Sequence, residues 1–201
     1  MPDFEIEEKY LNNNRNATVC GIDEVGRGCL FGPVVAGAVI LNPANLDYRI
    51  NDSKKLSKKK RLDLALSIYN NSLAYSIGWI WNDEIDNSNI LIATKKAMKM
   101  AVKNLQILPD YVLIDCMKPD FLNISGDGIV KGDNKSLSIA AASIIAKVFR
   151  DNLLIKMSKC FPGYNLNKNK GYPTKQHINM VQSLGQTFFH RRSFRIKNGK
   201  R

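Results

Sequence analysis

The alternation of apolar and polar positions divides the chain into segments with strand-like and helix-like patterns. Five stretches rich in β-branched and other apolar residues, bounded by glycine, proline or polar clusters, predict strands. They are TVCGIDEV (18–25), PVVAGAVIL (33–41), LAYSIGWIW (73–81), YVLID (111–115) and GIVKGD (128–133). The fourth of these strands ends on Asp115 and the fifth on Asp133, so two of the five end on a carboxylate.

Helical periodicity fills most of the chain between these stretches. Ser57 is in position for an N-cap, and the residues expected on one apolar face after it are Leu62, Ala65, Leu66 and Tyr69. A second helical face consists of Ile90, Ala93, Ala97, Ala101 and Leu105. Residues 136–161 predict a long helix whose first half is apolar nearly all round and therefore buried. Residues 174–184 predict a last short helix, and the polar residues 1–17 a short, loosely held one.

The order of these elements indicates an α/β fold with a mixed central sheet flanked by helices. Strands dominate the first part of the chain, and helices and strands alternate after it. The sequence contains no internal repeat, no Pro/Ser-rich linker and no low-complexity block, and 201 residues are enough for one ordinary domain. We therefore expect a single domain over residues 1–201, with an N-terminal arm (1–17) and a helical, basic C-terminal part from about residue 160.

Charge and cysteine content narrow the class of protein. The 30 Lys and Arg residues outnumber the 18 Asp and Glu residues, and the net charge of +12 suggests an anionic partner. Nucleic acid is the first candidate for that partner and an anionic membrane surface the second. The acidic start MPDFEIEEKY does not resemble a signal peptide, and the longest apolar run is too short to span a bilayer. We expect a cytoplasmic protein whose four widely spaced cysteines are buried thiols.

Acidic residues at strand ends are the strongest chemical signal in the sequence. Asp23, Asp115 and Asp133 each end or nearly end an apolar strand, and sites in α/β sheets collect beyond the carboxyl ends of strands. If these strands are neighbours, the three carboxylates converge with Glu24. Because adjacent strand residues point to opposite faces, Glu24 joins them only if the strand bends or ends there. The glycines that follow it, from Gly26 on, allow such a bend.

Converging carboxylates require protons or cations. Two unit charges about 4 Å apart repel by about 4 kcal/mol at an effective dielectric constant of about 20. An all-oxygen ligand set without histidine suits Mg²⁺ or Mn²⁺. An acidic, metal-binding pocket in a basic protein then indicates phosphoryl chemistry on nucleic acid. The alternative for each acid, taken singly, is a strand-end residue that hydrogen-bonds to backbone.

Other motifs leave two interpretations open. GRGCLFG (26–32) has the spacing G-x-G-x-x-x-G and precedes a strand, so it is not a dinucleotide-binding loop. Arg27 could pair with phosphate or be a solvated charge. Tyr172, between a glycine and a proline, could stack on a sugar or base or pack on its own loop. His177 and His190 could form the acid–base pair of a metal-free ribonuclease, but we interpret both as surface residues.

Two basic stretches are candidate phosphate contacts. The lysine-rich residues 52–61 could bind phosphates or form a solvated helix start, and we expect Ser53 and Lys54 within them to bind substrate. The tail after His190 has six basic residues and no acidic one. That tail could follow a nucleic-acid backbone or be a solvated basic end.

Together these motifs resemble type 2 ribonuclease H, the bacterial ribonuclease HII. The matching pieces are GIDEVGRGCLFGPVVAGAVIL, NDSKKLS, NILIATKKAM, YVLID, KGDNKSLSIAAASIIAKVFRD, FPGYNLNKNKGYPTKQH and HRRSF. They occur in the family's order and cover most of residues 18–195, whereas the arm and residues 116–127 diverge. The resemblance implies an RNase H-like fold. It also implies an endonuclease that cuts the RNA strand of RNA–DNA hybrids and incises at single ribonucleotides embedded in duplex DNA.

The resemblance also implies roles for individual residues. The four metal-binding acids would be Asp23, Glu24, Asp115 and Asp133, holding two divalent cations, Mn²⁺ or Mg²⁺. The backbone of Gly26, Arg27 and Gly28 would contact the ribose 2′-OH, and Tyr172 would lie against the sugar of the next, deoxy nucleotide. The product ends would be 3′-hydroxyl and 5′-phosphate.

Two departures from the family and two rival functions remain at this point. Cys29 stands where relatives often have proline, and Asn169 where they commonly have histidine; neither change removes a catalytic group. A non-catalytic RNA-binding or ribosome-associated protein would share the positive charge but has no use for four acids at strand ends. A metal-dependent DNase or resolvase of the same fold would share the acids but not the 2′-OH reader. The chain has no self-association signal, so we expect a monomer.

Overall fold

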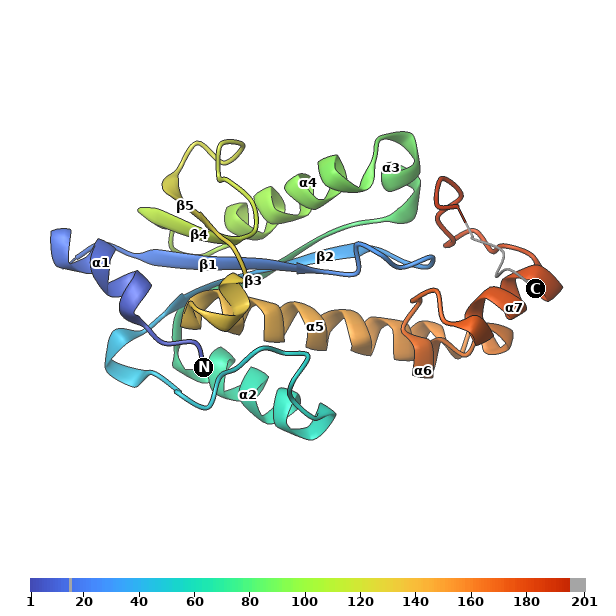
Figure 1. Ribbon diagram of the computed structural model, residues 1–201, viewed down its shortest axis with the longest axis horizontal. Helices are drawn as coiled ribbons and strands as arrows, with labels where there is room; N and C mark the ends of the chain where they lie inside the picture. Colours follow the sequence, from blue (N-terminus) through green and yellow to red (C-terminus); the bar gives the residue numbers. More distant parts are fainter. Residues whose placement is uncertain (15, 196–201) are drawn as a thin grey trace.

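The computed structural model, which describes residues 1–14 and 16–195, has a five-stranded sheet at its centre (Figure 1). The strands are β1 (Val19–Val25), β2 (Val34–Leu41), β3 (Ser72–Ile80), β4 (Tyr111–Asp115) and β5 (Ser125–Ile129). Their order in the sheet is β3-β2-β1-β4-β5. The first three strands are antiparallel, and β4 runs parallel to both β1 and β5. The predicted mixed sheet is confirmed.

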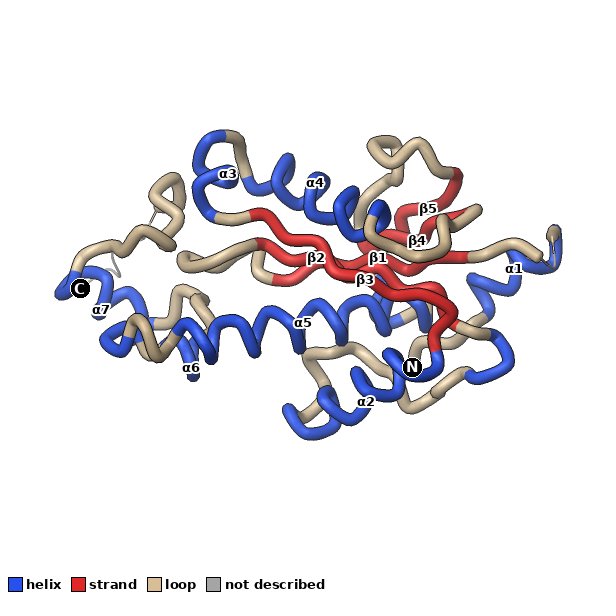
Figure 2. The backbone as a smooth tube through the Cα atoms, turned by 180° about the vertical axis from the view of Figure 1, so that it is seen from behind, coloured by secondary structure: helices blue, strands red, loops and turns tan. Residues whose placement is uncertain are grey.

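Helices cover both faces of the sheet and extend beyond one end of it. They are α1 (Glu5–Asn13), α2 (Lys58–Asn71), α3 (Asn82–Asn87), α4 (Ile90–Lys103), α5 (Leu137–Met157), α6 (Leu166–Asn169) and α7 (Lys175–Leu184), with 3₁₀ helices η1 (Pro43–Asn45), η2 (Gly132–Asn134) and η3 (Pro162–Tyr164). Figures 1 and 2 show α4 on one face and α5 with α2 on the other. At the far end of α5, α6 and α7 form the C-terminal part (Figure 1). None of the helices in the part of the chain that the structure describes is long and apolar enough to cross a membrane.

Polar side chains cap the starts of the main helices. The Ser57 hydroxyl accepts a hydrogen bond from the Lys60 amide, which confirms the predicted N-cap of α2. Ser136 caps α5 in the same way, because its hydroxyl accepts from the Ile139 amide at 3.1 Å. These bonds satisfy amide groups that have no partner within the first turn of a helix.

The central helix α5 lies unusually close to the sheet. A Cβ atom added to Gly37 on β2 would lie 2.4 Å from the carbonyl oxygen of Ala142 on α5. A Cβ atom on Gly21 of β1 would lie 2.1 Å from the carbonyl carbon of Ser138. Glycine is required at both strand positions because only hydrogen fits there. The close approach brings the polar residues of α5, Ser143 above all, near the end of β1.

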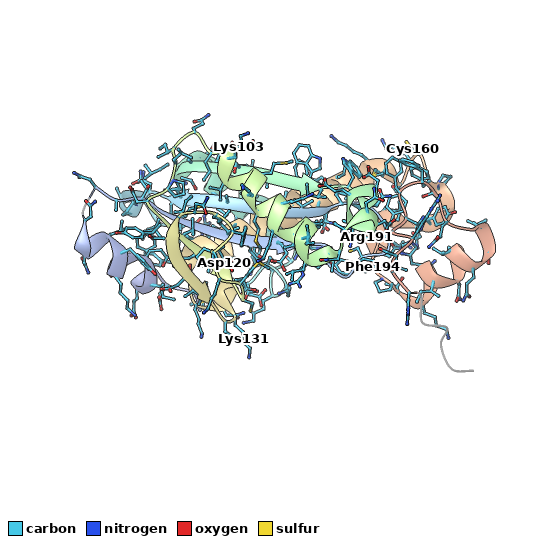
Figure 3. All side chains as sticks on the ribbon, turned by 90° about the horizontal axis from the view of Figure 1, so that it is seen from above. Lys103, Asp120, Lys131, Cys160, Arg191 and Phe194 are labelled. Carbon is cyan, nitrogen blue, oxygen red and sulfur yellow. The ribbon has the colours of Figure 1, made fainter. Side chains whose placement is uncertain are left out.

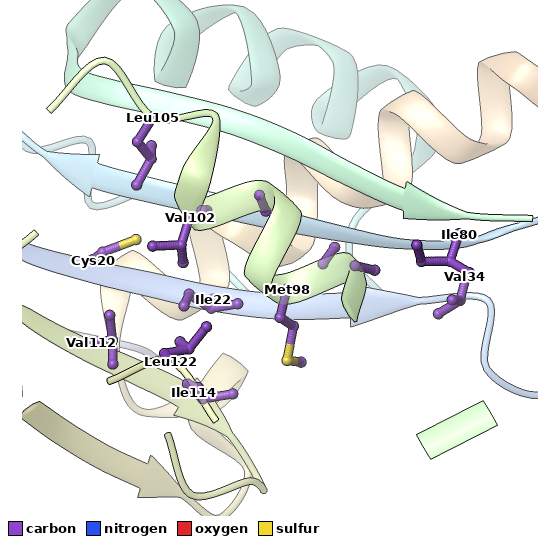
Figure 4. Packing of buried hydrophobic residues seen from close by; sticks show 14 of the residues in the cluster. Cys20, Ile22, Val34, Ile80, Met98, Val102, Leu105, Val112, Ile114 and Leu122 are labelled. Atoms are coloured by element: carbon purple, nitrogen blue, oxygen red, sulfur yellow. The ribbon is translucent and has the colours of Figure 1, made fainter. Parts of the chain in front are cut away.

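The opposite face of the sheet packs against α4 (Figure 4). Cys20 and Ile22 of β1, with Ile114 of β4, contact a layer that includes Met98 and Val102 of α4. The predicted apolar face of this helix is confirmed at its four inner positions. Those positions are Ala93, Ala97, Ala101 and Leu105, all buried, of which Leu105 follows the end of α4.

The predicted apolar face of α2 is wrong in part. The helix buries Leu64, Ala65 and Ile68, whereas Leu66 is 60% exposed. The reason is that α2 packs against both α5 and the loop before it, so its buried stripe is rotated from the one that the spacing suggests. Leu66 lines an open apolar groove between α2 and α5 instead.

The strand predicted at 128–133 is also displaced. The strand β5 covers Ser125–Ile129, and the chain then turns at Lys131, whose φ of 56° is left-handed. Asp133 therefore lies in η2 and not at a strand end. The sequence of β5, SGDGI, has little apolar character because this strand lies at the edge of the sheet.

The N-terminal arm is not loosely held. Glu7 of α1 is fully buried, and its carboxylate accepts hydrogen bonds from the Ser136 and Ser138 hydroxyls and from the Ser138 amide. The arm is thereby attached to the start of α5. The four cysteines are free thiols, as expected, but only Cys20 and Cys29 are buried.

Candidate active site

An acidic cavity of about 250 Å³ opens where β1 and β4 end. All the predicted site residues except Asp133 line it: Asp23, Glu24, Gly26, Arg27, Gly28, Ser53, Lys54, Asp115 and Tyr172. The parallel register of β1 and β4 pairs Ile22 with Ile114, so the residues that follow, Asp23 and Asp115, come side by side. The convergence expected from strand ends thus occurs for these two acids.

Asp23 is the most enclosed acid of the cavity. It is 5% exposed, and its Oδ1 atom accepts a hydrogen bond of 2.7 Å from the Glu24 amide. Burial raises the pKa of the Asp23 carboxyl well above its ordinary value, and repulsion by Glu24 and Asp115 raises it further. A hydrogen bond with Ser143 opposes this shift of the pKa. The site therefore favours a proton or a cation at Asp23.

Glu24 reaches the same cavity because β1 ends directly after it, at Val25. The sequence analysis required the strand to bend or end at Glu24, and β1 does end one residue after it. The Glu24 Oε1 atom accepts a hydrogen bond of 3.2 Å from Arg27. Burial raises the pKa of the Glu24 carboxyl, and the Arg27 guanidinium partly offsets that effect.

Asp133 adjoins the cavity and is not among the residues that line it. The Asp115 Oδ1 atom accepts a hydrogen bond of 2.7 Å from the Gly132 amide, which ties the end of β4 to the turn that holds Asp133. Asp133 is buried and its Oδ2 atom accepts from the Lys54 ammonium at 3.1 Å. Lys54, which lines the cavity, thus links Asp133 to it.

The acids fit a hard divalent cation by their chemistry, although their present arrangement is not a closed ligand shell. Within residues 1–14 and 16–195, no three His, Cys, Asp or Glu side chains are gathered as an ion site. The donor set is all oxygen, which suits Mg²⁺ or Mn²⁺. Arg27 and Lys54 each hold one acid, and Asp23 and Asp115 form no ion pair in the described part of the chain.

Two further polar residues of α5, Ser143 and Lys147, line the cavity and were not predicted. The Ser143 hydroxyl lies 3.0 Å from that of Ser53, which ties the loop before α2 to the site. Both residues interrupt the apolar helix at a spacing of four, and that interruption was the available signal in the sequence. Ser53 itself is held by Arg61, whose guanidinium donates to its carbonyl oxygen.

Tyr172 forms part of the cavity wall beneath two cations. Its ring centre lies 5.5 Å from the Lys147 ammonium and 5.8 Å from the Arg150 guanidinium. Burial raises the pKa of the Tyr172 hydroxyl to about 12, with a further contribution from Cys29. The phenol is therefore neutral near pH 7 and can donate a hydrogen bond.

The two histidines are buried neighbours, so the expectation of surface residues is wrong. The His190 Nδ1 atom accepts from the Thr187 amide at 2.9 Å, and the His177 Nδ1 atom lies 3.0 Å from the Tyr172 carbonyl oxygen. Because an amide only donates and a carbonyl only accepts, these contacts fix both tautomers. The His190 Nε2–H group then donates to the His177 Nε2 atom, 3.4 Å away. All four ring nitrogens are engaged, and none faces the cavity.

The basic tail is described only in part. The structure places Arg191 in the interior, whereas Arg192 and Ser193 donate their backbone amides to Asp86. The rest of the predicted tail, 196–201, lies outside the described residues.

Comparisons with known proteins identify the family to which the chain is similar. The model of the family described as ribonuclease HII matches residues 20–197. Proteins named ribonuclease HII from Caldicellulosiruptor bescii and Rickettsia akari are 47% and 50% identical to this chain, over 97% and 96% of its length. The matches cover 94% and 96% of those two proteins. The crystal structure of ribonuclease H2 from Pyrococcus horikoshii is similar at a TM-score of 0.74 and 25% identity, covering 89% of this chain and 94% of that one.

Proposed function

The chain belongs to the ribonuclease HII family, and from this premise we propose that it also incises at single ribonucleotides embedded in duplex DNA. Its activity as a hydrolase that cleaves RNA in hybrids follows from the family. The second substrate, the metal ions and the roles of single residues are our proposals. We further propose that residues 1–201 act as one catalytic domain with a substrate-binding C-terminal part.

In this proposal Asp23, Glu24, Asp115 and Asp133 hold two divalent cations, Mg²⁺ or Mn²⁺. Bound there, such cations would supply the Lewis-acid chemistry for hydrolysis of a phosphodiester to 3′-hydroxyl and 5′-phosphate ends. A bound cation would relieve the burial and the mutual repulsion that raise the pKa values of the Asp23 and Glu24 carboxyls. The observation that supports the proposal most directly is that Asp23, Glu24 and Asp115 line one cavity in a chain of net charge +12.

Cationic side chains around the acids would hold the substrate. Arg27, Lys54 and Lys147 line the same cavity, where they would face the phosphates of a bound strand. Ser53 supports this group through its contact with Ser143. The same cavity therefore contains acidic side chains that would bind cations and basic side chains that would bind the nucleic-acid backbone.

Recognition of the ribose is assigned to the Gly26-Arg27-Gly28 turn and to Tyr172. In the part of the chain that the structure describes, the amides of Arg27 and Gly28 donate no hydrogen bond, so they can bind a 2′-OH. The 2′-OH is the group that distinguishes RNA from DNA at a given site. Tyr172, packed against the neighbouring deoxyribose, would disfavour a second 2′-OH there and so select a ribo-to-deoxy junction.

One assay tests the proposed function. A labelled duplex with one ribonucleotide and an all-DNA control are incubated with Mg²⁺ or Mn²⁺, and then with chelator. We expect metal-dependent cutting of the first duplex only, and Asp23→Asn and Asp115→Asn should abolish it while the protein still folds and binds. Absence of cutting would support a nucleic-acid-binding protein, and cutting of both duplexes a DNase.

The role of Tyr172 has its own test. Tyr172→Ala should cleave the single-ribonucleotide duplex more slowly than the parent does and should lose the preference for a ribo-to-deoxy junction. Tyr172→Phe separates the hydroxyl from the ring. Parental rates on that duplex for both variants would count against the assignment.

A further inference from the structure

Two arginine side chains, Arg150 and Arg191, are completely buried behind the loop that connects β1 to β2. In the described part of the chain neither forms an ion pair, since the salt bridges there involve other residues. A buried cation without a nearby anion carries a large desolvation cost. A role beyond stability would explain why two such cations are present.

Both guanidinium groups are held by backbone carbonyls of the loops around the cavity. Arg150 donates to the carbonyl oxygens of Pro33, Lys170 and Phe31, at 3.0, 2.8 and 2.9 Å. Arg191 donates from Nε to Gly32 at 3.0 Å and from Nη1 to Arg27 at 2.8 Å. The carbonyl that Arg191 holds at Arg27 belongs to the turn proposed to read the ribose.

The bond from Arg191 to the Arg27 carbonyl fixes the direction of the next amide. The chain contains no cis peptide bond in the described residues, and in a trans peptide the C=O and the following N–H point in opposite directions. Because Arg191 holds the Arg27 oxygen from the interior, the Gly28 N–H group points away from the interior. A Cβ atom added to Gly28 would meet nothing within 4 Å, so this side of the turn is open. Gly28 also lines the acidic cavity, whereas Arg191 does not.

The position of Arg191 is itself fixed by packing. Its guanidinium carbon lies 5.0 Å from the ring centre of Phe194, and Figure 3 shows the two side chains next to each other. Its backbone amide donates to the Leu30 carbonyl at 2.8 Å. The side chain is thus anchored from the C-terminal segment while its guanidinium reaches the turn.

We infer that Arg191 is a positioning residue that orients the Arg27–Gly28 peptide so that the Gly28 N–H group recognises the ribose 2′-OH. The inference rests on the proposed function, because it assigns the support of the proposed 2′-OH reader. Lysine at position 191 keeps the charge but not the two-pronged geometry, so it would hold at most one of the two carbonyls. The readout must therefore be discrimination between ribose and deoxyribose, which a merely structural role would not change selectively.

The adjacent residue provides a matched control. Arg192 is exposed, and only its backbone amide is bonded to Asp86. Dissociation constants are measured in chelator for the single-ribonucleotide duplex and the all-DNA duplex, with the parent, Arg191→Lys and Arg192→Lys. We expect Arg191→Lys to lose about tenfold in affinity for the ribonucleotide duplex, the effect of one hydrogen bond, with the all-DNA affinity unchanged. Arg192→Lys should keep the parental ratio of the two affinities.

The outcomes separate this inference from the proposed function. A parent that neither discriminates between the duplexes nor cuts the ribonucleotide duplex would overturn both. The inference alone would be overturned if the parent discriminates between the duplexes but Arg191→Lys keeps the parental ratio of affinities. It would also be overturned if Arg191→Lys lost affinity for both duplexes equally.

A second measurement on the parent covers the case in which Arg191→Lys does not fold. In ¹⁵N-labelled protein, the Gly28 amide resonance should shift on addition of the ribonucleotide duplex and remain unshifted with the all-DNA duplex. The Arg191 Nε–H resonance should be protected from exchange with water in both states. A freely exchanging Nε–H group, or a Gly28 amide that responds equally to both duplexes, would overturn the inference.

Discussion

Acid should destabilise this protein through His190. The ring lies between Phe31 and Tyr164, with ring centres 4.9 and 5.0 Å away, and beside His177. No carboxylate is among these neighbours. Burial, and to a lesser extent His177, lowers the pKa of His190 from 6.5 to about 4. The folded protein therefore keeps this imidazole neutral at a pH at which the unfolded chain protonates it.

The sign and size of the effect follow from linkage. Since the pKa of His190 is lower in the folded state, the stabilisation is complete above pH 6.5 and is lost as the pH falls toward about 4. The full loss is about 3 kcal/mol, because 2.5 pKa units correspond to about 1.36 kcal/mol each. At pH 5.0 the loss reaches about 2 kcal/mol. The raised pKa values of Asp23 and Glu24 act in the opposite direction, since those carboxyls are protonated more readily in the folded state.

A comparison with His190→Asn isolates this contribution. The asparagine side-chain oxygen can still accept the Thr187 amide, but it does not titrate. Urea unfolding of both proteins at pH 7.5 and 5.0 gives four free energies of unfolding. The variant should be less stable at pH 7.5 because it loses aromatic packing. Between pH 7.5 and 5.0 the parent should lose about 2 kcal/mol more than the variant, since the carboxyls are common to both. Equal losses in the two proteins would refute the assignment of a buried, neutral His190.

Other substitutions test the site and its scaffold. Gly28→Ala should keep the parental stability within about 0.5 kcal/mol in urea unfolding, because its Cβ would meet nothing within 4 Å. It should nevertheless cleave the single-ribonucleotide duplex about tenfold more slowly, because the methyl group enters the cavity. Gly37→Ala should lose about 1–3 kcal/mol in the same unfolding assay, since its Cβ would lie 2.4 Å from a carbonyl oxygen of α5. In metal-free thermal unfolding Asp23→Asn should be more stable than the parent, because a buried, repelled charge is removed. Asp133→Asn should gain nothing there, because it also loses the ion pair with Lys54; equal melting temperatures for the two variants would contradict this reasoning.

Local sequence patterns predicted the elements of the fold well wherever one physical cause dominated. The strands β1 to β4 and the helices α4 and α5 follow from strong apolar periodicity, and Ser57 from capping chemistry. The edge strand β5 was predicted a few residues too late, at 128–133, because its residues, SGDGI, have little apolar character to mark it. The buried face of α2 was predicted wrongly in part, because several faces of this helix carry apolar residues. Tertiary packing, which local sequence does not show, decides which of them is buried.

The acids were predictable from position, and their partners were not. Asp23 and Asp115 meet because two parallel strands are in register, which strand-end reasoning anticipates. The ion pair between Lys54 and Asp133 joins residues 79 positions apart and has no local signal. The burial of His177, His190 and Arg191 was missed for a related reason. Polar residues in a basic segment look solvated unless the buried groups that hydrogen-bond to them are known.

The distribution of counter-charges within the cavity explains how an acidic site can exist before cations arrive. Arg27 holds Glu24 and Lys54 holds Asp133, so these two acids are partly neutralised by the chain itself. Asp23 and Asp115 have no ion-pair partner in the described residues. On the proposed function, cations that bind all four acids would compete with Arg27 and Lys54 for Glu24 and Asp133. Both side chains would then be released beside the substrate phosphates, so that cation binding and substrate binding would favour each other.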